Sequence, residues 1–250
     1  MVISDQEGFA ELRRRIERAR PTVEQDTHHE LSYGHVMSIL SMFGPRLEEG
    51  VLSAQQAQKL GISPARHRAA LRGWQRRAWN ALLCAEKILP LWSVDVVKPY
   101  LSPEDVIVLQ RQDLKHRILD AKMSVLLQQP FPISIPEFSG DNLTSAVYNQ
   151  VRVLIPVYQA SESYSVIERV LFVAGGDELN TFDVHRTYPS RWVDDDQDWY
   201  GVPSAIWASY TFAGSAEGDY APIDDAQKRR EFWLWWLDEA VPASWNFRTE

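Results

Sequence analysis

The end of the chain holds its densest group of aromatic residues, and this segment limits the fold more than any other. Three tryptophans stand within four positions and a fourth follows: Trp233, Trp235, Trp236 and Trp245. Rings of this size bury a large apolar area, so the segment must pack against the rest of the chain. We predict a helix from Ala226 to Val241, with Asp224 or Asp225 as its N-cap and Pro242 as its end.

The predicted helix has a core face and a charged face. At about 100° per residue, Phe232, Trp233 and Trp236 share one apolar arc. Trp235 falls on the other side, among Lys228, Glu231, Asp238 and Glu239. Its ring either contacts another segment of the same chain or serves as an aromatic anchor for a partner, because tryptophan is enriched at binding hot spots.

The first half of the chain predicts further helices. Apolar residues recur at three- and four-residue steps, and capping residues, prolines and glycines mark the ends. Ser53 and Gln56 have the spacing of a capping box, and Gly61 is the expected end of that helix. The other predicted helices span Glu7–Ala19 before Pro21, Leu31–Phe43 before Gly44, Pro64 to Pro90, and Pro103 to about Leu127.

The second half is more varied. Three prolines and a glycine make residues 129–140 a Pro-rich connector. Helices are expected at Thr144–Gln159 and Pro203–Ala213. Residues 163–174 fit a buried helix, but their β-branched content also permits a small β element. The fold class is therefore mainly α, as a single domain over residues 1–250, with a division into 1–128 and 141–250 as the alternative.

Composition and charge limit the functional class. The chain has 250 residues, 45% of them apolar and 24% charged, with one cysteine and no signal-like N-terminus, so we expect a cytoplasmic protein without a membrane partner. Residues 1–80 carry 12 basic and 9 acidic residues, a net charge of +3. Residues 135–225 carry 4 arginines and 15 acids, a net charge of −11. This acidic half disfavours nucleic acid and favours a basic partner surface, unless it is only a solvated surface.

One short acidic segment is a candidate recognition loop. Asp194, Asp195, Asp196 and Asp198 precede Trp199 in a stretch without helical periodicity. A calcium loop of the EF-hand type needs glycine at its sixth position and glutamate at its twelfth, and Trp199 and Ala205 stand there instead. Acids beside aromatic rings suit a basic protein surface, although a solvated turn with inward-packed rings explains them equally well.

Other patterns give little support for catalysis, a metal or a cofactor. His29 and His35 lie six positions apart, so they do not share a helix face as zinc-binding histidines do, and polar residues at a helix start explain them better. Cys84 stands between apolar residues and is expected to fill the core. We find neither a nucleophile motif nor a phosphate-binding glycine loop, so we expect no enzyme and no cofactor.

The segment around Gly61 has some features of a helix-turn-helix motif. A glycine turn joins two predicted helices, and a series of arginines follows on the second: Arg66, Arg68, Arg72, Arg76 and Arg77. Gln56 and His67 occupy positions where the motif expects apolar residues. A DNA-binding regulator is therefore an alternative function, opposed by the overall charge. Two consecutive core helices are the simpler explanation.

Two blocks of sequence resemble the predominantly helical immunity protein 5 family of bacterial polymorphic-toxin systems. One block is Arg77–Trp92, a helix that ends before a proline, and the other runs from Ala205–Gly214 to Arg229–Trp245. The resemblance implies a cytoplasmic, non-catalytic protein that binds and neutralises a cognate toxin. Family residues that contact the toxin cannot be transferred. Local charge and aromatic content point to a toxin-facing surface made by Asp194, Asp195, Asp196, Asp198, Trp199 and Trp235.

Overall fold

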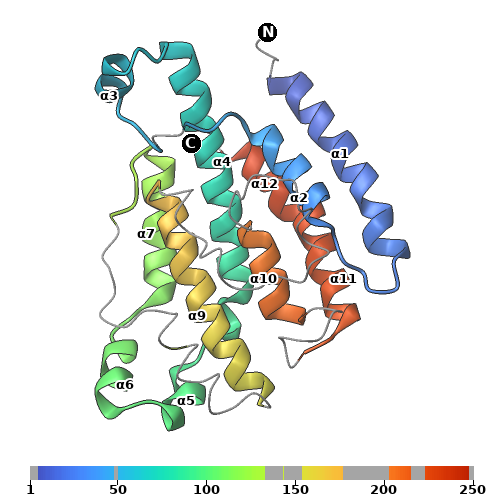
Figure 1. The fold of residues 1–250 in the computed structure, drawn as a ribbon, viewed down its shortest axis with the longest axis vertical. Helices are drawn as coiled ribbons and strands as arrows, with labels where there is room; N and C mark the ends of the chain where they lie inside the picture. The colour runs from blue at the N-terminus through green and yellow to red at the C-terminus, as the bar shows by residue number, and fades with distance from the viewer. Residues whose placement is uncertain are drawn as a thin grey trace.

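The longest described helix, α4 (Pro64–Ile88), runs through the middle of the molecule (Figure 1). It begins as the sequence predicts, because Ser63 accepts a hydrogen bond from the Arg66 N–H and Pro64 occupies the first turn. The computed structural model describes residues 5–47, 50–132, 143, 154–176, 203–214 and 223–247.

The other helices flank α4 on two sides. The elements before α4 are α1 (Asp5–Gln25), α2 (Tyr33–Leu40), η1 (Ser41–Phe43) and α3 (Ala54–Lys59). Those after it in the first half are η2 (Leu89–Leu91), α5 (Val94–Val97), η3 (Lys98–Tyr100), α6 (Pro103–Gln110) and α7 (Leu114–Leu126). In the second half they are α9 (Ile155–Ala174), α10 (Ser204–Ala213), α11 (Ala226–Trp235), the π-helical turn η5 (Trp236–Ala240) and α12 (Val241–Asn246).

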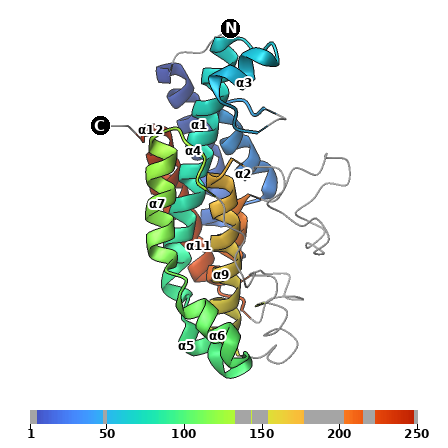
Figure 2. The ribbon, with the colours of Figure 1, turned by 90° about the vertical axis from the view of Figure 1, so that its left-hand side faces the viewer.

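Helices α7 and α9 lie on one side of α4, and α10, α11 and α12 lie on the other, with α1 at the outer edge (Figure 1). Figure 2 shows α3 and the pair α5 and α6 at opposite ends of the long axis. One cluster of buried apolar side chains extends from Leu12 to Trp245 and includes residues on both sides of the connector. The helices of the two halves therefore share a core, and the mainly α prediction is confirmed.

Several predicted helix signals are confirmed. Ser53 and Gln56 form a reciprocal capping box, and Gly61 adopts a φ of 70° after α3. Trp233 and Trp236 are fully buried, as the predicted core face requires. Within the parts of the chain described here, no helix is long and apolar enough to cross a membrane.

Residues 163–174 do not form a β element; they belong to α9. Nearly every side chain of this helix from Val157 to Ala174 is buried, because α4, α5, α7 and α10 all pack against it. A helix buried on all sides lacks a single apolar stripe, so its β-branched residues resemble a strand in the sequence. The predicted connector at 129–140 and the helix at Thr144–Gln159 lie largely outside the described residues, apart from the first turn of α9.

Two prolines do not end their helices as predicted. Helix α1 continues past Pro21 to Gln25, because Val23 extends its buried face while Pro21 and Glu17 lie on the exposed face. The carbonyl that loses its partner to a proline can there be hydrated. At the other end of the chain, the helix continues through Pro242 to Asn246.

The π-helical turn explains how the last helix accepts Pro242. In η5 the Val241 N–H donates to the Trp236 carbonyl, five residues earlier. A proline has no N–H to donate, and its ring crowds the carbonyl four residues before it. The wider turn immediately before Pro242 relieves both problems.

The predicted helix from Pro103 to about Leu127 is two helices. Helix α6 ends at Gln110, and α7 begins at Leu114. The Asp113 side chain accepts a hydrogen bond from the His116 N–H, which caps the second helix and marks a break that the apolar pattern alone does not reveal.

Candidate functional site

Asp194, Asp195, Asp196, Asp198 and Trp199 lie outside the described residues, so their role as a recognition surface stays a prediction.

Trp235, the remaining predicted site residue, lies half-buried beside α4. Its ring is 5.5 Å from that of Phe232, and the Lys87 Nζ is 4.9 Å from its centroid. Nearby, Asp238 pairs with Arg20 of α1. Trp235 therefore contacts its own chain, which is one of the two interpretations of its position. A role for its exposed part in binding a partner stays a prediction.

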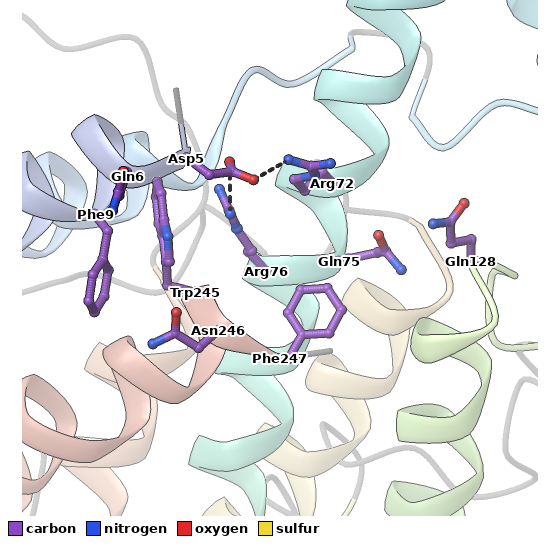
Figure 3. A pocket seen from close by; sticks show the side chains of 10 residues that line it. All are labelled: Asp5, Gln6, Phe9, Arg72, Gln75, Arg76, Gln128, Trp245, Asn246 and Phe247. Atoms are coloured by element: carbon purple, nitrogen blue, oxygen red, sulfur yellow. Dashed lines mark hydrogen bonds and ion pairs between the residues drawn. The ribbon is translucent and has the colours of Figure 1, made fainter. Parts of the chain in front are cut away.

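A cavity of about 500 Å³ opens where the start of α1, the N-terminal half of α4, the end of α7 and the end of α12 meet (Figure 3). Its walls combine charged, amide and aromatic side chains, and these come from segments far apart in the sequence. The lining residues are Asp5, Gln6, Phe9, Arg72, Gln75, Arg76, Gln128, Trp245, Asn246 and Phe247.

A buried polar network holds α12 against α4 and so fixes one wall of the cavity. The Trp236 Nε1–H donates to Asn80 Oδ1 at 3.0 Å, and Asn80 Nδ2 donates to the Ser244 hydroxyl at 3.1 Å. The Ser244 hydroxyl in turn donates to the Ala240 carbonyl at 2.6 Å, within the last turns of the helix. Because these groups are buried and bonded to each other, the position of Trp245 relative to α4 is well determined.

Gly8 allows α1 to approach the same wall. A Cβ atom at this position would lie 2.9 Å and 3.0 Å from two ring carbons of Trp245. On the same helix, Phe9 stacks on Trp245 with 6.1 Å between ring centroids. The absence of a side chain at Gly8 therefore lets the start of α1, and with it Asp5, close one side of the cavity.

Arg76 is the central charge of the cavity. Its guanidinium carbon lies 3.6 Å from the centroid of the Trp245 ring, and its side chain is only 8% exposed. Its Nη2 lies 3.4 Å from Asp5 Oδ1, whereas its buried Nε–H has no acceptor among the residues that the structure describes. Burial lowers the pKa of Arg76, and the nearby Asp5 carboxylate opposes this effect.

A second arginine shares the same carboxylate. Arg72 Nη1 donates to Asp5 Oδ2 at 2.6 Å (Figure 3). Two guanidinium groups therefore pair with the same carboxylate, whose side chain is 62% exposed. Among the described lining residues, the charged ones are Asp5, Arg72 and Arg76, and together they carry one positive charge more than negative. Such a group of donors beside aromatic rings suits the binding of an anion.

The arginines of the possible helix-turn-helix segment are only partly available to DNA. Arg76 is buried in the cavity wall, and Arg77 donates to the Gly44 carbonyl at 2.8 Å. Arg66 and Arg68 remain exposed at the start of α4. This arrangement fits α4 as a core helix, whereas α3 is not one, because Ala57 is the single buried residue of that short helix.

The histidines and the cysteine have local structural roles. The His29 and His35 rings bond to the Val23 carbonyl and the Ser32 hydroxyl. In the part of the chain that the structure describes, no three His, Cys, Asp or Glu residues gather in a way that could hold a metal ion. Cys84 is fully buried, as predicted, and burial raises the pKa of its thiol.

The comparison with known families bears on the second half of the chain. Residues 171–243 match the family model described as Immunity protein Imm5. This match confirms the resemblance seen in the sequence. No curated protein matches the chain. The matched span includes α10, α11 and η5, and it contains the more specific of the two sequence blocks, apart from the last two residues of that block.

Sequence reasoning missed the cavity. Asp5, Arg76 and Trp245 are separated by long stretches of chain, and no local spacing shows that they meet. One signal was available: Trp245 follows the buried tryptophans at a distance that a regular helix does not place on the same face. The site on α1 that receives Trp245 gave no comparable signal, because Gly8 by itself predicts only a lower helix propensity.

Proposed function

We propose that this protein is an immunity protein, which binds and neutralises a cognate secreted bacterial toxin in the cytoplasm of the producing cell without catalysis. The match of residues 171–243 to Immunity protein Imm5 is the observation that carries the proposal. The family points to a toxin as the partner in general terms. The individual toxin and the surface that meets it are part of the proposal.

The charge distribution supports a basic partner surface. Residues 135–225 carry a net charge of −11, and complementary charge accelerates the encounter of two proteins. We assign the toxin-facing surface to Asp194, Asp195, Asp196, Asp198 and Trp199, with the exposed part of Trp235. The acids would steer the approach, and the two rings would supply apolar contact area.

The first experiment is binding to the toxin candidate encoded by the gene directly upstream. We expect a tight one-to-one complex and loss of toxicity when the two proteins are co-expressed. If the purified protein neither binds this product nor protects cells from it, the proposal fails for that pair. Turnover of a small molecule by the purified protein alone would contradict the non-catalytic assignment.

A charge-reversal variant tests the assigned surface. Changing Asp194, Asp195, Asp196 and Asp198 to lysine is expected to slow association about tenfold or more at low salt. A control variant makes the same change in net charge at four exposed acids elsewhere: Glu17, Asp95, Glu104 and Asp120. Equal association rates for the two variants would exclude the acidic segment as a specific contact while leaving the toxin-binding proposal intact.

A further inference from the structure

The cavity between α1, α4, α7 and α12 contains a cation with too few partners. Arg76 can donate five hydrogen bonds, yet its only bond among the described residues is the 3.4 Å contact with Asp5. Within the same described part of the chain, its buried Nε–H has no acceptor. A buried arginine normally has its charge neutralised and its donors bonded, so this position is costly in the free protein.

The carboxylate that does reach this arginine is poorly placed to satisfy it. Asp5 lies in the first turn of α1, is mostly exposed, and makes its shorter bond to Arg72. A single carboxylate between two guanidinium groups leaves the pair with a net positive charge. A second carboxylate, or a better-placed one, would find a ready bidentate partner here.

The rest of the lining suits a carboxylate on a peptide better than a bare inorganic ion. Three aromatic rings, those of Phe9, Trp245 and Phe247, form part of the walls. The amide side chains of Gln6, Gln128 and Asn246 add neutral donors and acceptors of the kind that bond to peptide groups, while Gln75 already donates to the Val125 carbonyl. Apolar rings with a few placed polar groups are typical of sites that bind organic ligands.

We propose that this cavity is a binding site for an acidic side chain of a partner polypeptide, with Asp5 holding part of the site in the free protein. The partner's carboxylate would bond to Arg72 and Arg76, while the aromatic walls contact the rest of its side chain. The inference goes beyond the proposed function, because it involves a basic cavity instead of the acidic segment and does not require the partner to be a toxin.

The proposal is tested with purified protein and short blocked peptides. The probe is acetyl-Ala-Glu-Ala-amide, whose only charge is the glutamate side chain, and its control is the same peptide with glutamine. The readouts are the NMR signals of the Arg76 Nε–H and the Trp245 indole N–H, assigned with Arg76→Lys and Trp245→Phe. We expect the glutamate peptide to shift both signals in a saturable way and the glutamine peptide to shift neither.

Variants of the lining sharpen this test. Arg72→Gln, at an exposed position that folding tolerates, should weaken binding of the glutamate peptide about tenfold, which is the scale of one lost charge-assisted bond. Asp5→Asn should strengthen it, because the competing carboxylate is removed. Arg68→Gln removes an exposed arginine of the same helix outside the cavity and should change nothing.

Three results would overturn the proposal. The first is an equal response to the glutamate and glutamine peptides, or no saturable response to either. The second is equal binding by Arg72→Gln and Arg68→Gln. The third is saturable binding of inorganic phosphate in the absence of peptide binding, which would make the cavity a site for small anions. None of these results depends on a toxin, so they leave the proposed function unaffected.

Discussion

The tryptophans of the last helix occupy two different environments. Trp233 and Trp236 are fully buried in the shared apolar core. Trp235 is half-buried and lies beside Lys87, whereas Trp245 is buried at the margin of the core and lies beside Arg76. One short segment therefore supplies rings to the centre of the core, to the wall of the cavity and to the half-buried contact with Lys87. The comparison shows that aromatic content alone does not distinguish a structural ring from one available for binding; the neighbours decide.

The buried pair should account for the largest loss of stability. Trp236→Ala is expected to lower the free energy of unfolding by about 3–5 kcal/mol, because it leaves a large cavity and an unpaired Asn80 oxygen. Chemical denaturation monitored by circular dichroism measures this loss. Trp236→Phe, which keeps most of the ring volume, should cost clearly less. A loss equal to that of Trp235→Ala would contradict the distinction between the two environments.

Cys84 gives an independent measure of the same loss. Its thiol is buried in the core and its raised pKa keeps it protonated, so alkylation requires the protein to open. We expect Trp236→Ala to accelerate alkylation by iodoacetamide about a hundredfold or more, in line with its lower stability. Rapid alkylation of the unaltered protein would show that Cys84 is accessible without opening.

The raised pKa of the Cys84 thiol also sets a direction for pH dependence. In the unfolded chain a thiol ionises near pH 8.5, whereas in the folded protein it stays neutral. The contribution of Cys84 to the free energy of unfolding should therefore decrease as the pH rises above about 8.5. Comparing the unaltered protein with Cys84→Ala across this range isolates the effect.

Gly8→Ala tests how tightly Trp245 is packed. The added methyl group would clash with the indole ring, and overpacking costs about 1–3 kcal/mol, although alanine regains about 1 kcal/mol of helix propensity. We expect a net loss of about 1 kcal/mol by thermal unfolding. Gly34→Ala, near the start of α2 with no close neighbour, should cause no loss. Combining Gly8→Ala with Trp245→Leu should remove the penalty of the clash.

Trp235→Ala should have a similarly small effect. Its ring is half-buried, so the expected loss is about 1 kcal/mol, including the contact with Lys87. A double-mutant cycle with Lys87→Met measures the contact by itself. If Trp235 also binds a partner, Trp235→Ala should weaken the complex by more than it destabilises the free protein. Equal affinity would restrict this ring to a structural role.

The predictions from sequence succeed where the signal is local. The cap at Ser53, the start of α4 at Ser63 and the buried face with Trp236 all follow from neighbouring residues. The failures at Pro21 and Pro242 arise because tertiary packing and a π turn maintain helices that a proline normally ends. The sequence left residues 163–174 open between helix and strand, because a helix packed on several sides shows no single apolar stripe.

The acidic segment and the cavity also differ in whether a local sequence pattern reveals them. The acidic segment is a local pattern, so the sequence reveals it, although the structure does not describe it. The cavity depends on Asp5, Arg76 and Trp245 meeting in space, and no local spacing relates any one of them to another. Long-range contacts of this kind are set by the arrangement of the helices and become visible only in three dimensions.

The π-helical turn at Trp236–Ala240 has a consequence for comparing related chains. Such a turn holds one residue more than a regular α-helical turn, which rotates everything after it by about 100°. A relative without the additional residue would carry its last indole about a quarter of a turn around the helix axis, away from α1. Alignments of this region should therefore allow a gap of one position between Trp236 and Trp245. Relatives that keep the additional residue can form the cavity, whereas relatives that lack it cannot.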